Sequence, residues 1–128
     1  MKGRISALLA HEPVWRRQGS EPDYRFSLAN ERTFLAWIRT ALAVLAGGML
    51  LEQFATRLQT RAIALGVALA MCLLAAALAL LAYRRWRDNE IAMRHQRKLP
   101  WSVLLILLAA GIFGAATTLT VMLAAGTP

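Results

Sequence analysis

The sequence predicts an all-α integral membrane protein with three transmembrane helices per subunit. Hydrophobic residues make up 58% of the 128-residue chain and are concentrated in three long runs, at about residues 34–54, 62–83 and 101–125. Each run is close to the roughly 20 residues that an α-helix needs to cross a hydrocarbon core of about 30 Å. We therefore expect a three-helix membrane domain over residues 27–128, preceded by an N-terminal arm over residues 1–26.

The N-terminal arm mixes aromatic, basic and proline residues. Pro13 and Pro22 interrupt it, and Trp15 and Tyr24 lie beside arginines, a mixture that is typical of a membrane interface. Two alternatives fit this composition: a short amphipathic helix on the membrane surface, or a flexible cytoplasmic arm.

The first span follows polar residues that can start a helix. Ser27 and Asn30 are candidate N-caps, because a short polar side chain can accept hydrogen bonds from the free N–H groups of the first turn. Glu31 follows, where the helix dipole favours a negative charge. Arg32 lies about 100° around the helix from Glu31, so we expect Glu31 to form a supporting ion pair with a neighbouring helix or subunit instead.

Two arginines define one face of this helix. Arg32 and Arg39 are seven residues apart, so their directions differ by roughly 20°, and Arg39 lies roughly 7–8 Å inside the span as measured from Phe34. Polar residues in membrane helices usually face a bundle interior or a watery cavity, so the two arginines are expected to face protein or a pore. The alternative is that both side chains reach back to phosphate head groups at the membrane surface.

Small residues recur along all three spans and favour close packing between helices. The connection at residues 52–61 is short, so the first two spans should form an antiparallel hairpin. The expected packing positions are Ala36, Ala43, Gly47, Gly66, Gly111 and Gly114. They offer more close-packing surface than one three-helix bundle can use, which predicts a symmetric homo-oligomer.

The stretch at residues 84–98, between the second and third spans, is predicted to form a basic cytoplasmic loop. Its basic residues are Arg84, Arg85, Arg87, Arg94, Arg97 and Lys98. The favoured explanation is the excess of positive charge that cytoplasmic loops carry. The alternative is a binding site for phosphate or anionic lipid, and membrane lipids, anionic ones in particular, are expected partners.

Several functional classes are disfavoured. The sequence contains no Walker loop, nucleotide fingerprint, Ser/His/Asp set or pair of catalytic carboxylates, so we expect neither an enzyme nor a cofactor. The single cysteine, Cys72, and the two distant histidines, His11 and His95, give no metal-binding spacing. The basic residues that give the net charge of +8 flank the apolar spans. The charge therefore indicates membrane topology and not nucleic-acid binding.

The segment Asn30-Glu-Arg-Thr-Phe-Leu-Ala-Trp-Ile-Arg-Thr40 resembles the signature of the YidH-like bacterial inner-membrane proteins, a domain-of-unknown-function family. A similar signature occurs in the membrane part of the eukaryotic vacuolar transporter chaperone complex, which makes polyphosphate and moves it across a membrane. The resemblance implies three-helix subunits in a ring, pentameric by analogy, around a basic pore that Arg32 lines.

These observations favour an oligomeric protein of the bacterial inner membrane with an arginine-lined pathway for anions, phosphate or polyphosphate. Arg32 and Arg39 would form stacked basic rings near its cytoplasmic mouth, and rings of arginine are how pores select anions. The alternative is a non-conducting scaffold or accessory subunit that binds anionic lipid or a partner protein. A proton-coupled transporter is disfavoured, because Glu31 and Glu52 lie at the edges of the first span.

The distribution of basic residues predicts the orientation in the membrane. The segment through Arg32 and the stretch at residues 84–98 each carry six Lys or Arg, whereas residues 52–61 carry two and the C-terminal tail none. The N-terminus should therefore be cytoplasmic and the C-terminus periplasmic. A topology reporter fused to the C-terminus should be active in the periplasm. If a C-terminal fusion were active only in the cytoplasm, the three-span prediction would be contradicted.

Overall fold

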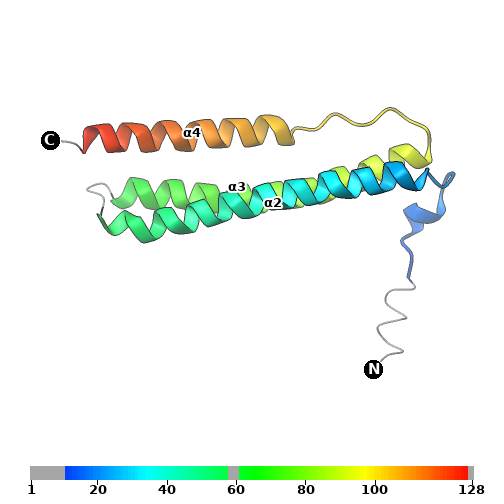
Figure 1. Cartoon of the computed structure of the whole chain (residues 1–128), viewed down its shortest axis with the longest axis horizontal. Helices are drawn as coiled ribbons and strands as arrows, with labels where there is room; N and C mark the ends of the chain where they lie inside the picture. Colours follow the sequence, from blue (N-terminus) through cyan, green and yellow to red (C-terminus); the bar gives the residue numbers. More distant parts are fainter. Residues whose placement is uncertain (1–10, 58–60, 127–128) are drawn as a thin grey trace, which may run out of the picture.

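The computed structural model describes residues 11–57 and 61–126 of the chain. Three long helices dominate it: α2 (Tyr24–Phe54), α3 (Arg61–Arg94) and α4 (Leu104–Ala125). All three are long and apolar enough to cross a membrane, which confirms the predicted all-α class with three spans. Figure 1 shows α2 and α3 as a close antiparallel hairpin with α4 running alongside.

Two short 3₁₀ helices flank α2. The first, η1 (Val14–Arg17), precedes it, and the second, η2 (Ala55–Arg57), leads toward α3. The Trp15 ring in η1 lies edge-on to the Trp86 ring of α3, with 6.0 Å between their centroids. This part of the expected arm therefore packs on the C-terminal part of α3, while residues 1–10 lie outside the described residues.

Small side chains hold α2 and α3 together. The buried residues of the hairpin include Ala41, Val44, Ala64, Ala68, Ala75 and Leu78. A close approach occurs at Gly48, where an added Cβ atom would lie 3.1 Å from the backbone carbonyl oxygen of Ala68. Small residues allow this approach between helix backbones, as they commonly do in membranes.

Helix α4 packs mainly on α3. Its first residue, Leu104, is 2% exposed and belongs to one buried cluster with Ala41, Val44 and Leu78. Further along, a Cβ atom at Gly111 would overlap the Leu74 side chain, so this glycine makes room for α3. Most other side chains of α4 are exposed and apolar, which is suited to lipid or to another subunit.

The start of α2 differs from the expectation. Asp23 is the N-cap, and its Oδ1 accepts a hydrogen bond from the Arg25 backbone N–H at 3.1 Å. Ser27 and Asn30, the expected N-caps, lie inside the helix instead. The proposal of these caps was wrong because it placed the helix start next to the apolar run, whereas the helix begins at Tyr24 in a polar segment.

The prediction of a basic loop at residues 84–98 is also wrong, because α3 continues through Arg94. The basic residues end the apolar run without ending the helix, since neither glycine nor proline occurs between Gly66 and Pro100. The helix ends where Gln96 adopts a φ of +52° and the Arg97 N–H donates to the Ala92 carbonyl at 2.9 Å. Four of the six basic residues are therefore helical, and Arg97 and Lys98 follow the helix.

The hairpin contact gives a matched pair of glycine substitutions. Gly48→Leu should lower the free energy of unfolding by about 1–3 kcal/mol, because the larger side chain overpacks the α2–α3 contact. Gly66→Leu is the control, since an added Cβ there meets nothing within 4 Å. Thermal unfolding of both variants in the same detergent checks this. Equal stability of the two variants would contradict the close approach at Gly48.

Candidate functional site

Arg32 and Arg39 project from the side of α2 that faces away from α3. Asn30 and Gly48 are buried against α3, and Arg39 lies nine residues from each of them. Nine residues at about 100° each bring Arg39 to the opposite side of the helix, with Arg32 within about 20° of it. Both arginines are exposed, and neither side chain has a hydrogen bond or ion pair within the described part of the chain.

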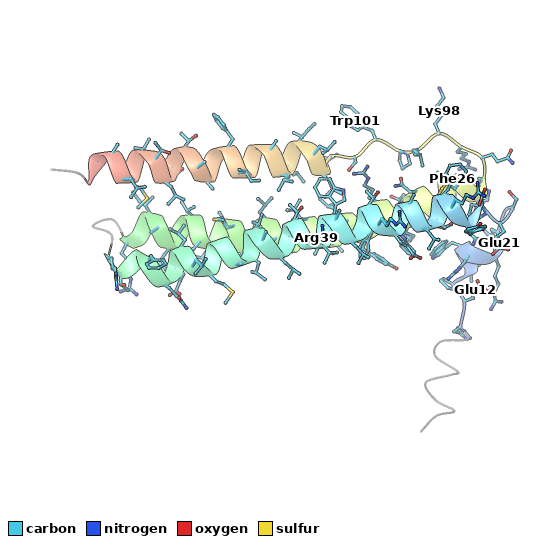
Figure 2. All side chains as sticks on the ribbon, viewed as in Figure 1. Glu12, Glu21, Phe26, Arg39, Lys98 and Trp101 are labelled. Carbon is cyan, nitrogen blue, oxygen red and sulfur yellow. The ribbon has the colours of Figure 1, made fainter. Side chains whose placement is uncertain are left out.

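The residue at which α4 begins shows how deep Arg39 lies in the membrane span. Leu104 begins α4 and shares a buried cluster with Ala41 of α2, two residues after Arg39. Figure 2 accordingly marks Arg39 on α2 near the level at which α4 begins. With 22 residues, α4 is about 33 Å long, close to the thickness of the hydrocarbon core. Arg39 therefore lies at the edge of the span that α4 defines, on the side from which α2 enters it, less deep than the estimate from Phe34.

A third arginine extends the same face. Arg25 is seven residues before Arg32 and is exposed, with its guanidinium carbon 6.0 Å from the centroid of the Tyr24 ring. Arg25 was not among the predicted site residues, because the helix was expected to start after it. Arg25, Arg32 and Arg39 together form a basic stripe about 21 Å long on one side of α2. We call these three residues the arginine face.

Some of the predicted packing residues pack within the subunit, and the others lie on its surface. An added Cβ at Gly47 would lie 3.0 Å from the Met71 side chain, and Gly111 contacts Leu74, so these two glycines pack within the subunit. Ala36 and Ala43 are exposed beside the arginine face, and Gly66 and Gly114 have open space around them. These four small residues are free to contact lipid or a second copy of the chain.

The structure brings together a buried polar cluster that the sequence analysis did not predict. The Asn30 Nδ2 donates to the Trp86 carbonyl at 3.0 Å and to Glu90 Oε1 at 3.3 Å. Ser27 Oγ donates to Glu90 Oε2 at 3.3 Å, and Asn89 Nδ2 donates to Asn30 Oδ1 at 3.1 Å. This cluster joins the N-terminal part of α2 to the C-terminal part of α3.

The N-terminal segment closes over the end of α3. The Arg94 guanidinium donates to the Arg16 carbonyl, and the Ser20 backbone N–H donates to the Arg94 carbonyl at 3.1 Å. Gly19 adopts a φ of +78°, and a Cβ atom there would lie 2.6 Å from the Arg94 carbonyl oxygen. Glycine is needed at this crossing for both its conformation and its size.

A cavity of about 480 Å³ lies between η1, the start of α2 and the end of α3. It is lined by Trp15, Arg16, Glu21, Pro22, Asp23, Tyr24, Ser27, Glu31, Trp86, Glu90 and Arg94. Four of the chain's seven acidic residues are in this lining, so the cavity is unsuited to anions. Glu31 is exposed on its rim and has no ion pair with another described residue, so its predicted supporting role has no partner within the subunit.

The six basic residues at 84–98 do not form one cluster. Arg84 is exposed, Arg85 places its guanidinium carbon 5.8 Å from the centroid of the Trp37 ring, and Arg87 Nε lies 3.7 Å from Asp88 Oδ1. Arg94 is buried, as described above, and Arg97 and Lys98 are exposed beyond the helix. Within residues 11–57 and 61–126, no group of three His, Cys, Asp or Glu residues could hold a metal ion.

Comparison with known proteins decides the family. A family model described as a domain of unknown function, DUF202, matches residues 25–92. The chain belongs to the DUF202 family. The matched segment contains all of α2 except Tyr24 and most of α3, and with them the arginine face and the polar cluster.

Two relatives of this DUF202 protein illustrate the match. The inner membrane protein YidH of Escherichia coli K12 is 52% identical over 93 residues, which cover 73% of this chain and 81% of YidH. The uncharacterized protein Rv2272 of Mycobacterium tuberculosis H37Rv is 48% identical over 83 residues, which cover 62% of this chain and 66% of Rv2272. The similarity to an inner membrane protein agrees with the three candidate spans, and no solved structure matches the chain significantly.

The polar cluster predicts a specific loss of stability. Asn30→Ala should lower the free energy of unfolding by about 1–3 kcal/mol, because it leaves Glu90 Oε1 and Asn89 Nδ2 without their hydrogen-bond partner. Thr33→Ala is the control, since the exposed Thr33 hydroxyl donates only to the Ala29 carbonyl of its own helix. It should change stability by less than about 0.5 kcal/mol. Denaturation in detergent followed by circular dichroism checks the difference, and equal losses would contradict a stabilising cluster.

Proposed function

We propose that this DUF202 protein is a subunit of an inner-membrane homo-oligomer whose arginine face lines a pathway for anions. The single observation that supports this is the position of Arg39. Arg39 lies at the edge of the span, on the side of α2 opposite α3, and its guanidinium has no partner among the described residues. Neither α3 nor α4 of the same subunit compensates this charge.

The cost of an uncompensated arginine is the physical reason for the proposal. An arginine at the centre of a span costs about 2.5–3.5 kcal/mol on insertion scales, and the cost is lower at the edge, where Arg39 lies. Charged residues within spans accordingly face water or a partner. A ring of copies with the arginine faces inward would place Arg39 next to water. The exposed Ala36 and Ala43 beside this face would let neighbouring helices approach closely.

The type of anion follows from the chemistry of the ring. Stacked arginine rings attract anions, and guanidinium groups bind phosphate oxygens through paired N–H donors. The resemblance of residues 30–40 to the signature in the eukaryotic vacuolar transporter chaperone complex supports phosphate or polyphosphate as the transported species and a ring, pentameric by analogy, as the assembly.

The competing function is a non-conducting scaffold or accessory subunit. Its supporting observation is the same depth of Arg39, because a long side chain at the edge of the span can reach lipid phosphates without a pore. In this case the arginine face would bind anionic lipid or a partner protein. Transport and lipid binding can be measured separately, so one set of variants distinguishes the two functions.

The transport prediction concerns Arg39. Arg39→Leu should lower the flux of chloride, phosphate or short polyphosphate into liposomes at least about tenfold, because it removes one charge per subunit from the ring. Arg32→Ala should lower the flux less, because Arg32 lies nearer bulk water, where its field is screened. Native mass spectrometry should show the same oligomer for each variant.

The matched control for this experiment is Arg57→Leu, which removes the same charge from an exposed residue of η2 at the other end of α2. This variant should keep the wild-type flux. If the wild type passes none of the three anions while Arg39 is needed for binding to anionic lipid, the pore proposal is wrong and the scaffold takes its place.

A further inference from the structure

A small notch lies where α3 extends past the beginning of α4. Its volume is about 180 Å³, below the roughly 300–1,000 Å³ of sites for drug-sized ligands. Arg84 and Arg85 of α3 line it, together with Trp101 and Ser102 of the connection to α4. Trp101 is 87% exposed and projects outward from this connection (Figure 2). A single head group fits such a space better than a larger ligand.

The notch lies at the level of lipid head groups. Leu104 marks the edge of the hydrocarbon core, because α4 begins there and its 22 residues match the core thickness. Arg84 and Arg85 share the notch with Leu104, on the part of α3 that extends beyond this edge. Tyr83 and Trp101 are both exposed, as is typical of aromatic residues at the interface between lipid and water.

The notch offers hydrogen-bond donors that the subunit does not use. The Arg85 guanidinium lies over the Trp37 ring, with its carbon 5.8 Å from the ring centroid, and its buried Nε has no hydrogen-bond partner within the described residues. A guanidinium carries five N–H donors and buried donors usually have an acceptor, so Arg85 can still donate to a bound group with oxygen acceptors. The exposed Arg84 adds a second guanidinium beside it. The nearby N-terminus of α4 adds a positive partial charge.

The one carboxylate in this lining does not reverse its charge. Asp88 Oδ1 lies 3.7 Å from Arg87 Nε, so its negative charge is shared with a third arginine. Arg84 and Arg85 therefore leave the notch basic. Its chemistry is complementary to a phosphate group, which is the acceptor that a bilayer presents at this depth.

We propose that the notch binds the phosphate group of an anionic phospholipid, one molecule per subunit. Arg84 and Arg85 donate to the phosphate, Trp101 packs at the level of the lipid backbone, and the acyl chains lie along the exposed apolar side chains of α4. The site lies on the α3 and α4 side of the subunit, opposite to the arginine face, so it does not depend on the proposed anion pathway.

Native mass spectrometry of the full chain with added lipid tests this proposal. The probes are phosphatidylglycerol, phosphatidylcholine and inorganic phosphate. The wild type should retain phosphatidylglycerol in preference to phosphatidylcholine, and the double variant Arg84→Gln, Arg85→Gln should bind it at least about tenfold more weakly. The matched control is Arg97→Gln, Lys98→Gln, which removes two charges from exposed residues outside the notch and should bind as the wild type does.

Each outcome decides the proposal. Equal weakening by the two double variants would show general attraction to surface charge and would overturn a site in the notch. Binding of inorganic phosphate to the delipidated wild type, lost in the Arg84/Arg85 variant and not competed by phosphatidylglycerol, would overturn the lipid as the occupant. Arg84→Gln alone, at an exposed side chain, gives the same test if the double variant does not fold, and it should weaken binding about threefold or more.

Discussion

The rotation of α2 about its own axis, relative to α3, determines which of its side chains face away from the hairpin. Gly48 fixes it in the membrane, where an added Cβ atom would lie 3.1 Å from the Ala68 carbonyl oxygen and would push α2 away from the α3 backbone. Asn30 fixes it outside the membrane through hydrogen bonds to Trp86 and Glu90. The two contacts are eighteen residues apart, or five turns at 3.6 residues per turn, so they lie on the same side of the helix. Arg39, midway between them, must face the opposite way.

The same hairpin gives the subunit two different regions. Beyond the start of α4, α2 and α3 continue as a polar pair that holds η1 through Arg94 and Ser20. Within the span, apolar side chains of all three helices are exposed, and α4 contributes little to burial apart from Leu104 and the contact at Gly111. The polar region is thus stabilised by hydrogen bonds within the chain, whereas the membrane region has large surfaces for lipid or further copies.

Much of the span architecture was predictable because it depends on local sequence. Three apolar runs predicted three spans, and the seven-residue spacing of Arg32 and Arg39 predicted a shared face. The extension of α3 was not predictable from hydropathy, since Arg84 changes the polarity of the helix but not its backbone. The contact between Asn30 and Glu90 joins residues sixty positions apart, so it depends on the register of the hairpin. The only local signal was the presence of Ser27 and Asn30, two short polar side chains just before the apolar run. They were interpreted as N-caps of the helix.

The central claim is that water reaches the arginine face within the membrane. Ala46 lies seven residues beyond Arg39 on the same side of α2 and is exposed. Leu73 of α3 is 72% exposed and lies about 140° around its helix from Ala68, which contacts α2. In a Cys72→Ala background, Ala46→Cys and Leu73→Cys can be compared by labelling in membrane vesicles with a charged thiol reagent. The account predicts labelling at position 46 and none at position 73. Absence of labelling at both positions would contradict a water-filled pathway along the arginine face.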